Sequence, residues 1–167
     1  MATHKISMLG SMTLPDTSGE VFFEQASANF DEAENIYDHL LLVYNDSGNA
    51  ADYCYGSFKV PENYSGTAKV ELVWADNNEG TADLNFDFGY RAIATGESGA
   101  PTADQETVAI DDSSSATIEI KQSIESSLAD NFSPSDTVLW RLARDSTSGT
   151  GIAEPVYVFE LNFIYDD

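Results

Sequence analysis

Apolar and polar residues alternate strictly through much of the chain, and the alternation is clearest where the apolar positions are aromatic. In 84–91, one side of the alternation consists of Leu84, Phe86, Phe88 and Tyr90. Successive side chains of a β-strand point to opposite faces, so this run places its aromatic rings on one face of a sheet, whereas a helix would scatter them around its axis. Strands with the same pattern are predicted at 70–74, 116–120, 138–142 and 157–166. Shorter strands are expected at 39–44, 53–60 and 107–110 and near Val21.

The predicted strands and the turns between them favour an all-β fold. Turn-forming residues follow several of the strands, as at 45–48, 76–80 and 146–149. Eight or nine antiparallel strands without an internal repeat are typical of a two-sheet antiparallel β-sandwich of jelly-roll type. A closed up-and-down barrel is the alternative, and an immunoglobulin sandwich is disfavoured because its paired cysteines are absent. Residues 123–131 are expected to form one short helical turn.

The first 20 residues differ from the rest of the chain. They contain a group of apolar residues: Ile6, Met8, Leu9, Met12 and Leu14. Gly10, Pro15 and Gly19 interrupt any regular element there. We therefore predict an extended N-terminal arm at 1–20 and a jelly-roll domain at 21–167. The arm either folds back on its own domain or attaches to a neighbouring subunit, and in the second case the apolar group is the predicted assembly contact.

The net charge narrows the range of partners. The 167 residues include 29 Asp and Glu but 7 Lys and Arg, which gives a formal net charge of −22. A nucleic-acid-binding protein must neutralise phosphates, so nucleic acid is an unfavourable partner for this chain. An anionic membrane surface is disfavoured for the same reason. No apolar run is long enough for a membrane-spanning helix, so we expect neither kind of partner.

The sequence contains no recognised catalytic motif. Cys54 is the only cysteine, so an intrachain disulfide is excluded, and His4 and His39 belong to no nucleophile–base pattern. The run 76–80 imitates the start of a calcium-binding loop but lacks the closing Glu, so a hairpin turn explains it better. We expect no enzymatic activity, no cofactor and no metal-binding residues.

Tyrosines offer a different kind of candidate site. Tyr53 and Tyr55 fall on the same face of a predicted strand, opposite Cys54 and Gly56. Tyrosine rings on an exposed sheet face can stack against sugar rings. These two residues are therefore the glycan-facing aromatics in the alternative interpretation of the function.

Five segments of the chain resemble small jelly-roll virion structural proteins of tailed phages. They are MATHKISMLGSMTLPDTSGEVFFE, YGSFKVPENYSGTAKVELVW, LNFDFGYRAIA and NFSPSDTVLWRLARDST with the closing VYVFELNFIYDD. The most distinctive part is F-x-P-x-D-x-V-x-x-R-L-x-R-D at 132–145.

The resemblance implies a non-enzymatic capsid decoration (cement) protein. Such a protein would form a homotrimer, bind the major capsid protein on the outer capsid surface and stabilise the shell. The alternative is a tail or fibre component, including a glycan-binding adhesin. The opening MATHKISMLG lacks the apolar stretch of a secretion signal, so we expect synthesis in the host cytoplasm and a final location in the virion.

Overall fold

The computed structural model confirms the predicted β-sandwich. It describes residues 2–14, 21–25, 40–44, 53–76, 81–97, 106–113, 120–126, 128–129, 132–144 and 156–167. Within these ranges it contains eleven strands and one short 3-10 helix, Leu9–Ser11. The strands are β1 (Thr3–Ser7), β2 (Met12–Thr13), β3 (Val21–Gln25), β4 (Leu40–Tyr44), β5 (Tyr53–Lys59), β6 (Ala68–Asp76), β7 (Asp83–Ile93), β8 (Glu106–Ser113), β9 (Lys121–Glu125), β10 (Thr137–Arg144) and β11 (Val156–Asp166).

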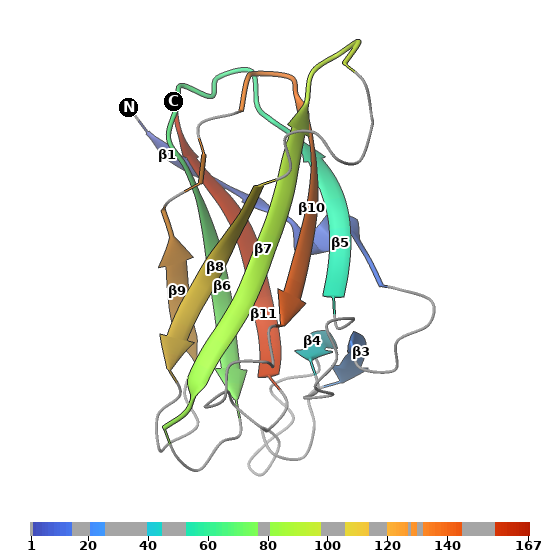
Figure 1. Ribbon diagram of the computed structural model, residues 1–167, viewed down its shortest axis with the longest axis vertical. Helices are drawn as coiled ribbons and strands as arrows, with labels where there is room; N and C mark the ends of the chain where they lie inside the picture. The colour runs from blue at the N-terminus through green and yellow to red at the C-terminus, as the bar shows by residue number, and fades with distance from the viewer. Residues whose placement is uncertain are drawn as a thin grey trace.

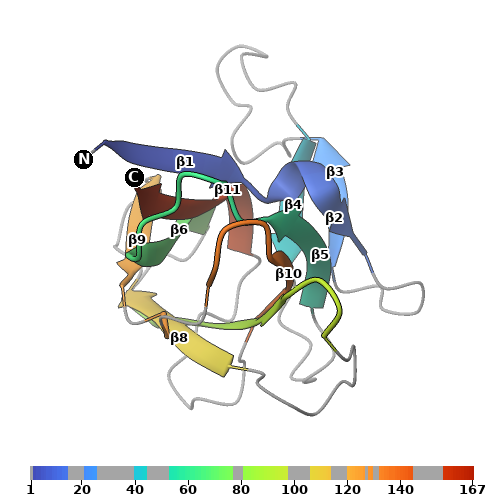
Figure 2. The same ribbon diagram turned by 90° about the horizontal axis from the view of Figure 1, so that it is seen from above.

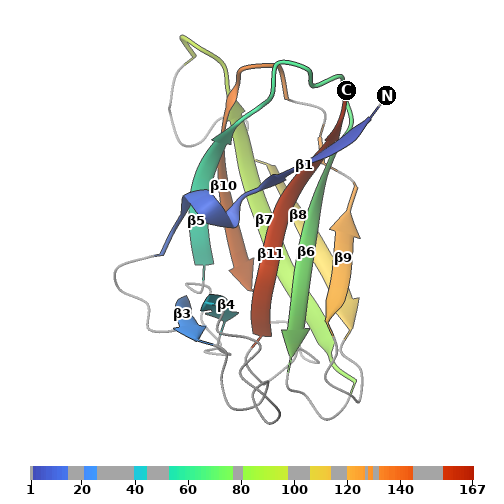
Figure 3. The same ribbon diagram turned by 180° about the vertical axis from the view of Figure 1, so that it is seen from behind.

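The strands form two antiparallel sheets packed face to face. The front sheet, which faces the viewer in Figure 1, has the order β2-β5-β10-β7-β8. The back sheet, seen in Figure 3, has the order β3-β4-β11-β6-β9. β1 also pairs with β11, along the edge of β11 that pairs with β4. Their facing sides bury the largest core side chains, among them Trp74, Tyr44, Phe86, Phe88 and Phe163.

The strand order is that of a jelly roll. β4 pairs with β11 and β6 with β9 in the back sheet, while β5 pairs with β10 and β7 with β8 in the front sheet. The chain therefore follows the path of one long hairpin, with its turn between β7 and β8, that has been rolled so that successive strands alternate between sheets.

The described part of the predicted N-terminal arm adds a strand to each sheet of its own chain. β1 runs along β11 in the back sheet, and β2 pairs with β5 in the front sheet (Figure 2). Between them, the side chain of Met8 is fully buried, and its backbone N–H donates to the carbonyl of Leu161 at 2.8 Å. Residues 2–14 thus connect the two sheets at one side of the sandwich.

The structure corrects the prediction for the region around Ser123. Residues 121–125 form strand β9 and not the start of a helical turn. Ser123 points inward and accepts a hydrogen bond from the Trp74 indole at 2.8 Å, whereas Ile124 faces outward and is 52% exposed. The predicted strand at 116–120 lies mostly outside the described residues, and its last residue, Ile120, precedes β9 and is exposed. His39 and residues 77–80 also lie outside them.

Candidate binding face of the front sheet

The outer face of the front sheet carries the tyrosines that the sequence suggested. Along β5 the burial alternates, so that Cys54 and Phe58 point into the core and Tyr53 and Tyr55 point outward. Along β10, Trp140 and Leu142 are buried, and Leu139 faces outward. Because β5 and β10 are neighbours, these outward side chains lie on one continuous surface.

Three outward residues form an exposed apolar surface that we call the front platform: Tyr53, Tyr55 and Leu139. Tyr55 is 41% exposed and Leu139 is 48% exposed. The ring centroids of Tyr53 and Tyr55 lie 6.2 Å apart, and the two rings are tilted by 42°. The platform is therefore an open surface with two aromatic rings at an angle to each other.

Arg141 borders this platform. It is paired with Tyr55 across the β5–β10 ladder, and its guanidinium carbon lies 5.8 Å from the centroid of the Tyr53 ring. Arg141 is exposed, so its N–H groups are available on the same surface as the tyrosine rings. Stacking of a guanidinium on a tyrosine ring is a favourable cation–π arrangement.

The cysteine that lies beneath the platform, Cys54, is unreactive. Cys54 is fully buried, and the Tyr44 hydroxyl oxygen lies 3.0 Å from its Sγ. Burial raises the pKa of the Cys54 thiol to about 12, although hydrogen bonds from Tyr44 and the backbone act in the opposite direction. Because the thiolate is the nucleophilic form, Cys54 is an inert core residue.

The back sheet carries a buried carboxylate on its outer face. Glu71 is 1% exposed because Lys5, Asn162 and Gln122 surround it. Lys5 Nζ donates to both carboxylate oxygens at 2.8 and 2.7 Å, and Asn162 Nδ2 donates at 2.8 Å. Burial raises the pKa of Glu71, but these hydrogen bonds and the charge of Lys5 outweigh it and leave the pKa below its ordinary value. Both carboxylate oxygens accept hydrogen bonds from side chains of β1, β9 and β11, so we assign this cluster a structural role.

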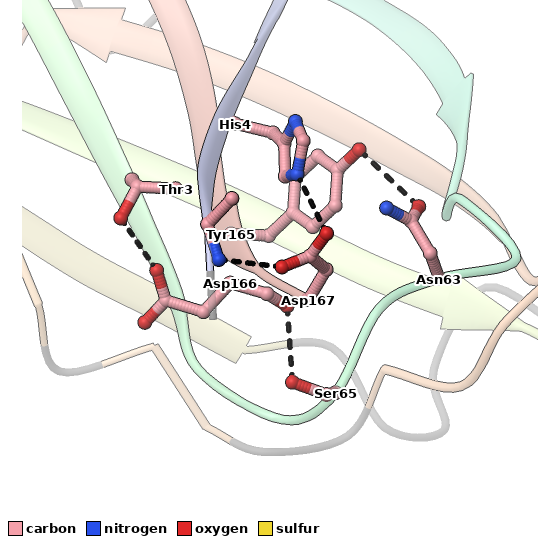
Figure 4. Close-up of polar contacts among 8 residues, drawn as sticks. Thr3, His4, Asn63, Ser65, Tyr165, Asp166 and Asp167 are labelled. Carbon is pink, nitrogen blue, oxygen red and sulfur yellow. Dashed lines mark hydrogen bonds and ion pairs between the residues drawn. The ribbon is translucent and has the colours of Figure 1, made fainter.

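The two ends of the chain are joined by a second polar cluster, shown in Figure 4. The Ala2 backbone N–H donates to Asp167 Oδ1 at 2.5 Å, and the Thr3 hydroxyl donates to Asp166 at 2.8 Å. His4 Nε2 lies 3.0 Å from Asp167 Oδ2, and its ring stacks on Tyr165. The hydrogen bond from Thr3 to Asp166 and that from Ala2 to Asp167 hold the pKa of each carboxyl below its ordinary value. These contacts fix β1 against the end of β11.

The structure places the predicted assembly residues on their own domain. Met8 is buried in the core, and the other four, Ile6, Leu9, Met12 and Leu14, are partly buried against it. The prediction that this group also contacts a neighbouring subunit stays a prediction. Tyr53 and Tyr55 do lie together on the surface, whereas Leu139 and Arg141 were not predicted because they come from another strand.

No set of ligands for a metal ion stands out. Among the described residues, no group of three or more His, Cys, Asp or Glu side chains has an arrangement suited to a metal. None of the helices in the described ranges has the length and hydropathy needed to cross a bilayer. The front platform is therefore the candidate binding surface that we consider further.

Comparison with known proteins supports the fold assignment. A scan against protein-family models finds no match, and a search of the curated proteins finds none either. Among solved structures, the chain is similar to the CBM22-1–GH10 modules of Clostridium thermocellum endo-1,4-β-D-xylanase 10B, solved with xylohexaose. The TM-score is 0.51 at 12% identity, over 94% of this chain and 26% of that chain.

A second similar structure is a single module of a larger enzyme. It is the family 30 carbohydrate-binding module of the cellulosomal cellulase Cel9D-Cel44B of Clostridium thermocellum, with a TM-score of 0.50 at 9% identity. The match covers 99% of this chain and 92% of that module. At these identities the likeness shows the shared β-sandwich fold alone. The fold and the front platform together define a β-sandwich module with an open aromatic surface.

Proposed function

We propose that this protein is a non-catalytic glycan-binding module and that the glycan lies on the front platform. The observation that carries the proposal is the exposure of Tyr55 beside Tyr53 and Leu139 on one sheet face. A tyrosine ring can pack against the C–H face of a sugar, and its hydroxyl group can hydrogen-bond with sugar hydroxyls. The fold shared with carbohydrate-binding modules supports the proposal.

The proposal is tested by glycan-array binding followed by titration of the best ligand. We expect saturable binding that weakens about tenfold when Tyr55→Ala removes the exposed ring, which corresponds to about 1.4 kcal/mol. Ile124→Ala is the matched control, because Ile124 is 52% exposed but lies on the outer face of the back sheet. The absence of saturable binding, or an equal loss in both variants, would rule out a site on the front platform.

A second candidate function is a structural role in a virion, and the residues of the resemblance at 132–145 favour it. In the structure, several of these residues serve the fold. Phe132 packs at 5.3 Å from the rings of Tyr90 and Phe163, and the Asp136 carboxylate accepts the backbone N–H of Ser133 at 2.8 Å. The segment is thus explained without a partner, and the virion role rests on the resemblance.

The virion role has its own test. Quantitative mass spectrometry of purified particles would give the copy number of the protein, and native mass spectrometry of the free protein would detect the expected homotrimer. Hundreds of copies per particle support decoration of the capsid, and a few to dozens support the tail. If the protein is absent from particles, this candidate is excluded while the glycan-binding proposal is unaffected.

A further inference from the structure

Arg141 has no carboxylate partner among the residues that the structure describes, although the chain is rich in carboxylates. Other cations of the described chain do find carboxylates, as His4, Lys5 and Arg91 do. Arg141 forms no ion pair with any part of the chain that the structure describes, although the sequence contains 29 Asp and Glu residues. Its guanidinium lies against the Tyr53 ring. An exposed guanidinium with free N–H groups is a site for an acceptor that the chain itself does not supply.

The residues directly beside and opposite Arg141 in the sheet are uncharged. On β10 its outward neighbours are Leu139 and Ala143, which carry no charge. Across the ladders it faces Tyr55 on β5 and Gly89 on β7, which are also uncharged. The nearest outward acid on β7, Asp87, lies opposite Ala143 and therefore diagonal to Arg141, and Arg141 forms no ion pair with it.

We infer that Arg141 binds a carboxylate of the ligand, so that the preferred glycan carries uronic acid residues. The inference rests on the proposed function, because the sugar ring would pack on Tyr55 while its carboxylate meets the guanidinium opposite. A planar guanidinium can donate two parallel hydrogen bonds to the two oxygens of one carboxylate. A sugar hydroxyl group has a single oxygen and cannot accept this pair of bonds.

The net charge restricts how many carboxylates the ligand carries. At −22 the protein repels a densely charged polyanion. At physiological ionic strength, screening acts over about 8 Å, so a single carboxylate held at Arg141 interacts mainly with the guanidinium. The ligand class is therefore a largely neutral glycan chain with isolated uronate residues.

The experiment uses pairs of oligosaccharides that differ only at the carboxyl group. β-1,4-Linked oligosaccharides of xylose, glucose and mannose, each bearing one glucuronate as its single charged group, are titrated before and after reduction of the carboxyl group to an alcohol. We expect the wild-type protein to bind the carboxylate form of its ligand about fivefold more tightly, as for an exposed ion pair of favourable geometry. Added salt should reduce this ratio, because it screens the charge pair.

Variants of Arg141 assign the preference to its side chain. Arg141→Gln should bring the ratio of the two affinities to one, and Arg141→Lys should leave an intermediate ratio because lysine keeps the charge but loses the planar donor pair. Lys59→Gln is the matched control, since Lys59 is an exposed cation on the same face of β5, four residues from Tyr55. It should retain the wild-type ratio.

The outcomes separate this inference from the proposed function. If the wild-type protein binds both forms equally, or if Arg141→Gln keeps the preference, the uronate inference is wrong while the glycan-binding site stands. If neither form of any oligosaccharide binds and the glycan array is also negative, both proposals fail. Binding of a sulfated form in place of the carboxylate form would likewise overturn the assignment to uronate.

Discussion

Gly56 lies directly opposite Trp140 in the β5–β10 ladder, and the indole fills the space that a side chain at position 56 would need. A β-carbon at position 56 would lie 2.6 Å from Trp140 Cζ2 and 2.8 Å from the backbone oxygen of Ser11. The indole and the arm residue Ser11 thus both approach β5 on the inner side of the front platform. The absence of a side chain at position 56 makes room for the Trp140 indole beneath the strands that carry Tyr55 and Arg141.

Gly56→Ala is therefore expected to destabilise the domain. Overpacking of a buried site costs about 1–3 kcal/mol, and here one of the three clashing atoms belongs to the backbone, so a change of rotamer cannot relieve it. Denaturant unfolding followed by tryptophan fluorescence measures the change. Gly10→Ala is the control, because a β-carbon at Gly10 meets no atom within 4 Å and should leave stability nearly unchanged. Equal stability of Gly56→Ala and wild type would contradict the packing described here.

Met8 offers a test of the N-terminal arm as part of the domain. Its side chain is fully buried, so Met8→Ala should lower the free energy of unfolding by about 2–5 kcal/mol through lost packing and a cavity. Ile120→Ala provides a comparison, because Ile120 is exposed and should change stability little. A loss at Met8 as small as that at Ile120 would argue against this placement of the arm.

How much of this structure could be predicted depends on where each interaction partner lies in the chain. The aromatic alternation of 84–91 predicted β7 directly, because the period of two is contained in one segment. β9 was missed because its inward residue is Ser123, which is polar and is satisfied by Trp74. β1 was missed because its partner, β11, lies about 160 residues away along the chain.

The candidate site shows the same limit. Tyr53 and Tyr55 were recognised because they are two residues apart on one strand. Arg141 joins them only through the register between β5 and β10, which the one-dimensional pattern does not contain. Long-range pairing of strands therefore determines the part of the site that the sequence alone could not reveal.

Cys54 is expected to resist alkylation in the folded protein. With its pKa raised to about 12 and its side chain buried, the thiolate is scarce and inaccessible at pH 8. Mass spectrometry after iodoacetamide treatment should show no labelling under native conditions and complete labelling in 6 M guanidinium chloride. Rapid labelling of the native protein would show that the Cys54 side chain reaches solvent.

Glu71 makes the stability of the domain dependent on pH in a defined direction. Its pKa is lowered below the ordinary 4.5 in the folded state, so it binds its proton more weakly there than in the unfolded chain. The resulting stabilisation is fully present above pH 4.5 and is lost as the pH falls through the folded-state pKa. Because Lys5 donates to both oxygens, this loss weakens the attachment of β1 to the back sheet.

We expect Glu71→Gln to lower the free energy of unfolding by about 2 kcal/mol at pH 7, since charged hydrogen bonds to a buried carboxylate are lost. The difference from wild type should shrink as the pH falls below 4.5, where the wild-type carboxylate also becomes protonated. Urea unfolding at pH 7, 5, 4 and 3 measures both quantities. Asp111→Asn removes one negative charge from an exposed position on β8 and should be nearly neutral at every pH. A Glu71→Gln effect that is constant across this range would show that the charge of Glu71 does not hold β1 in place.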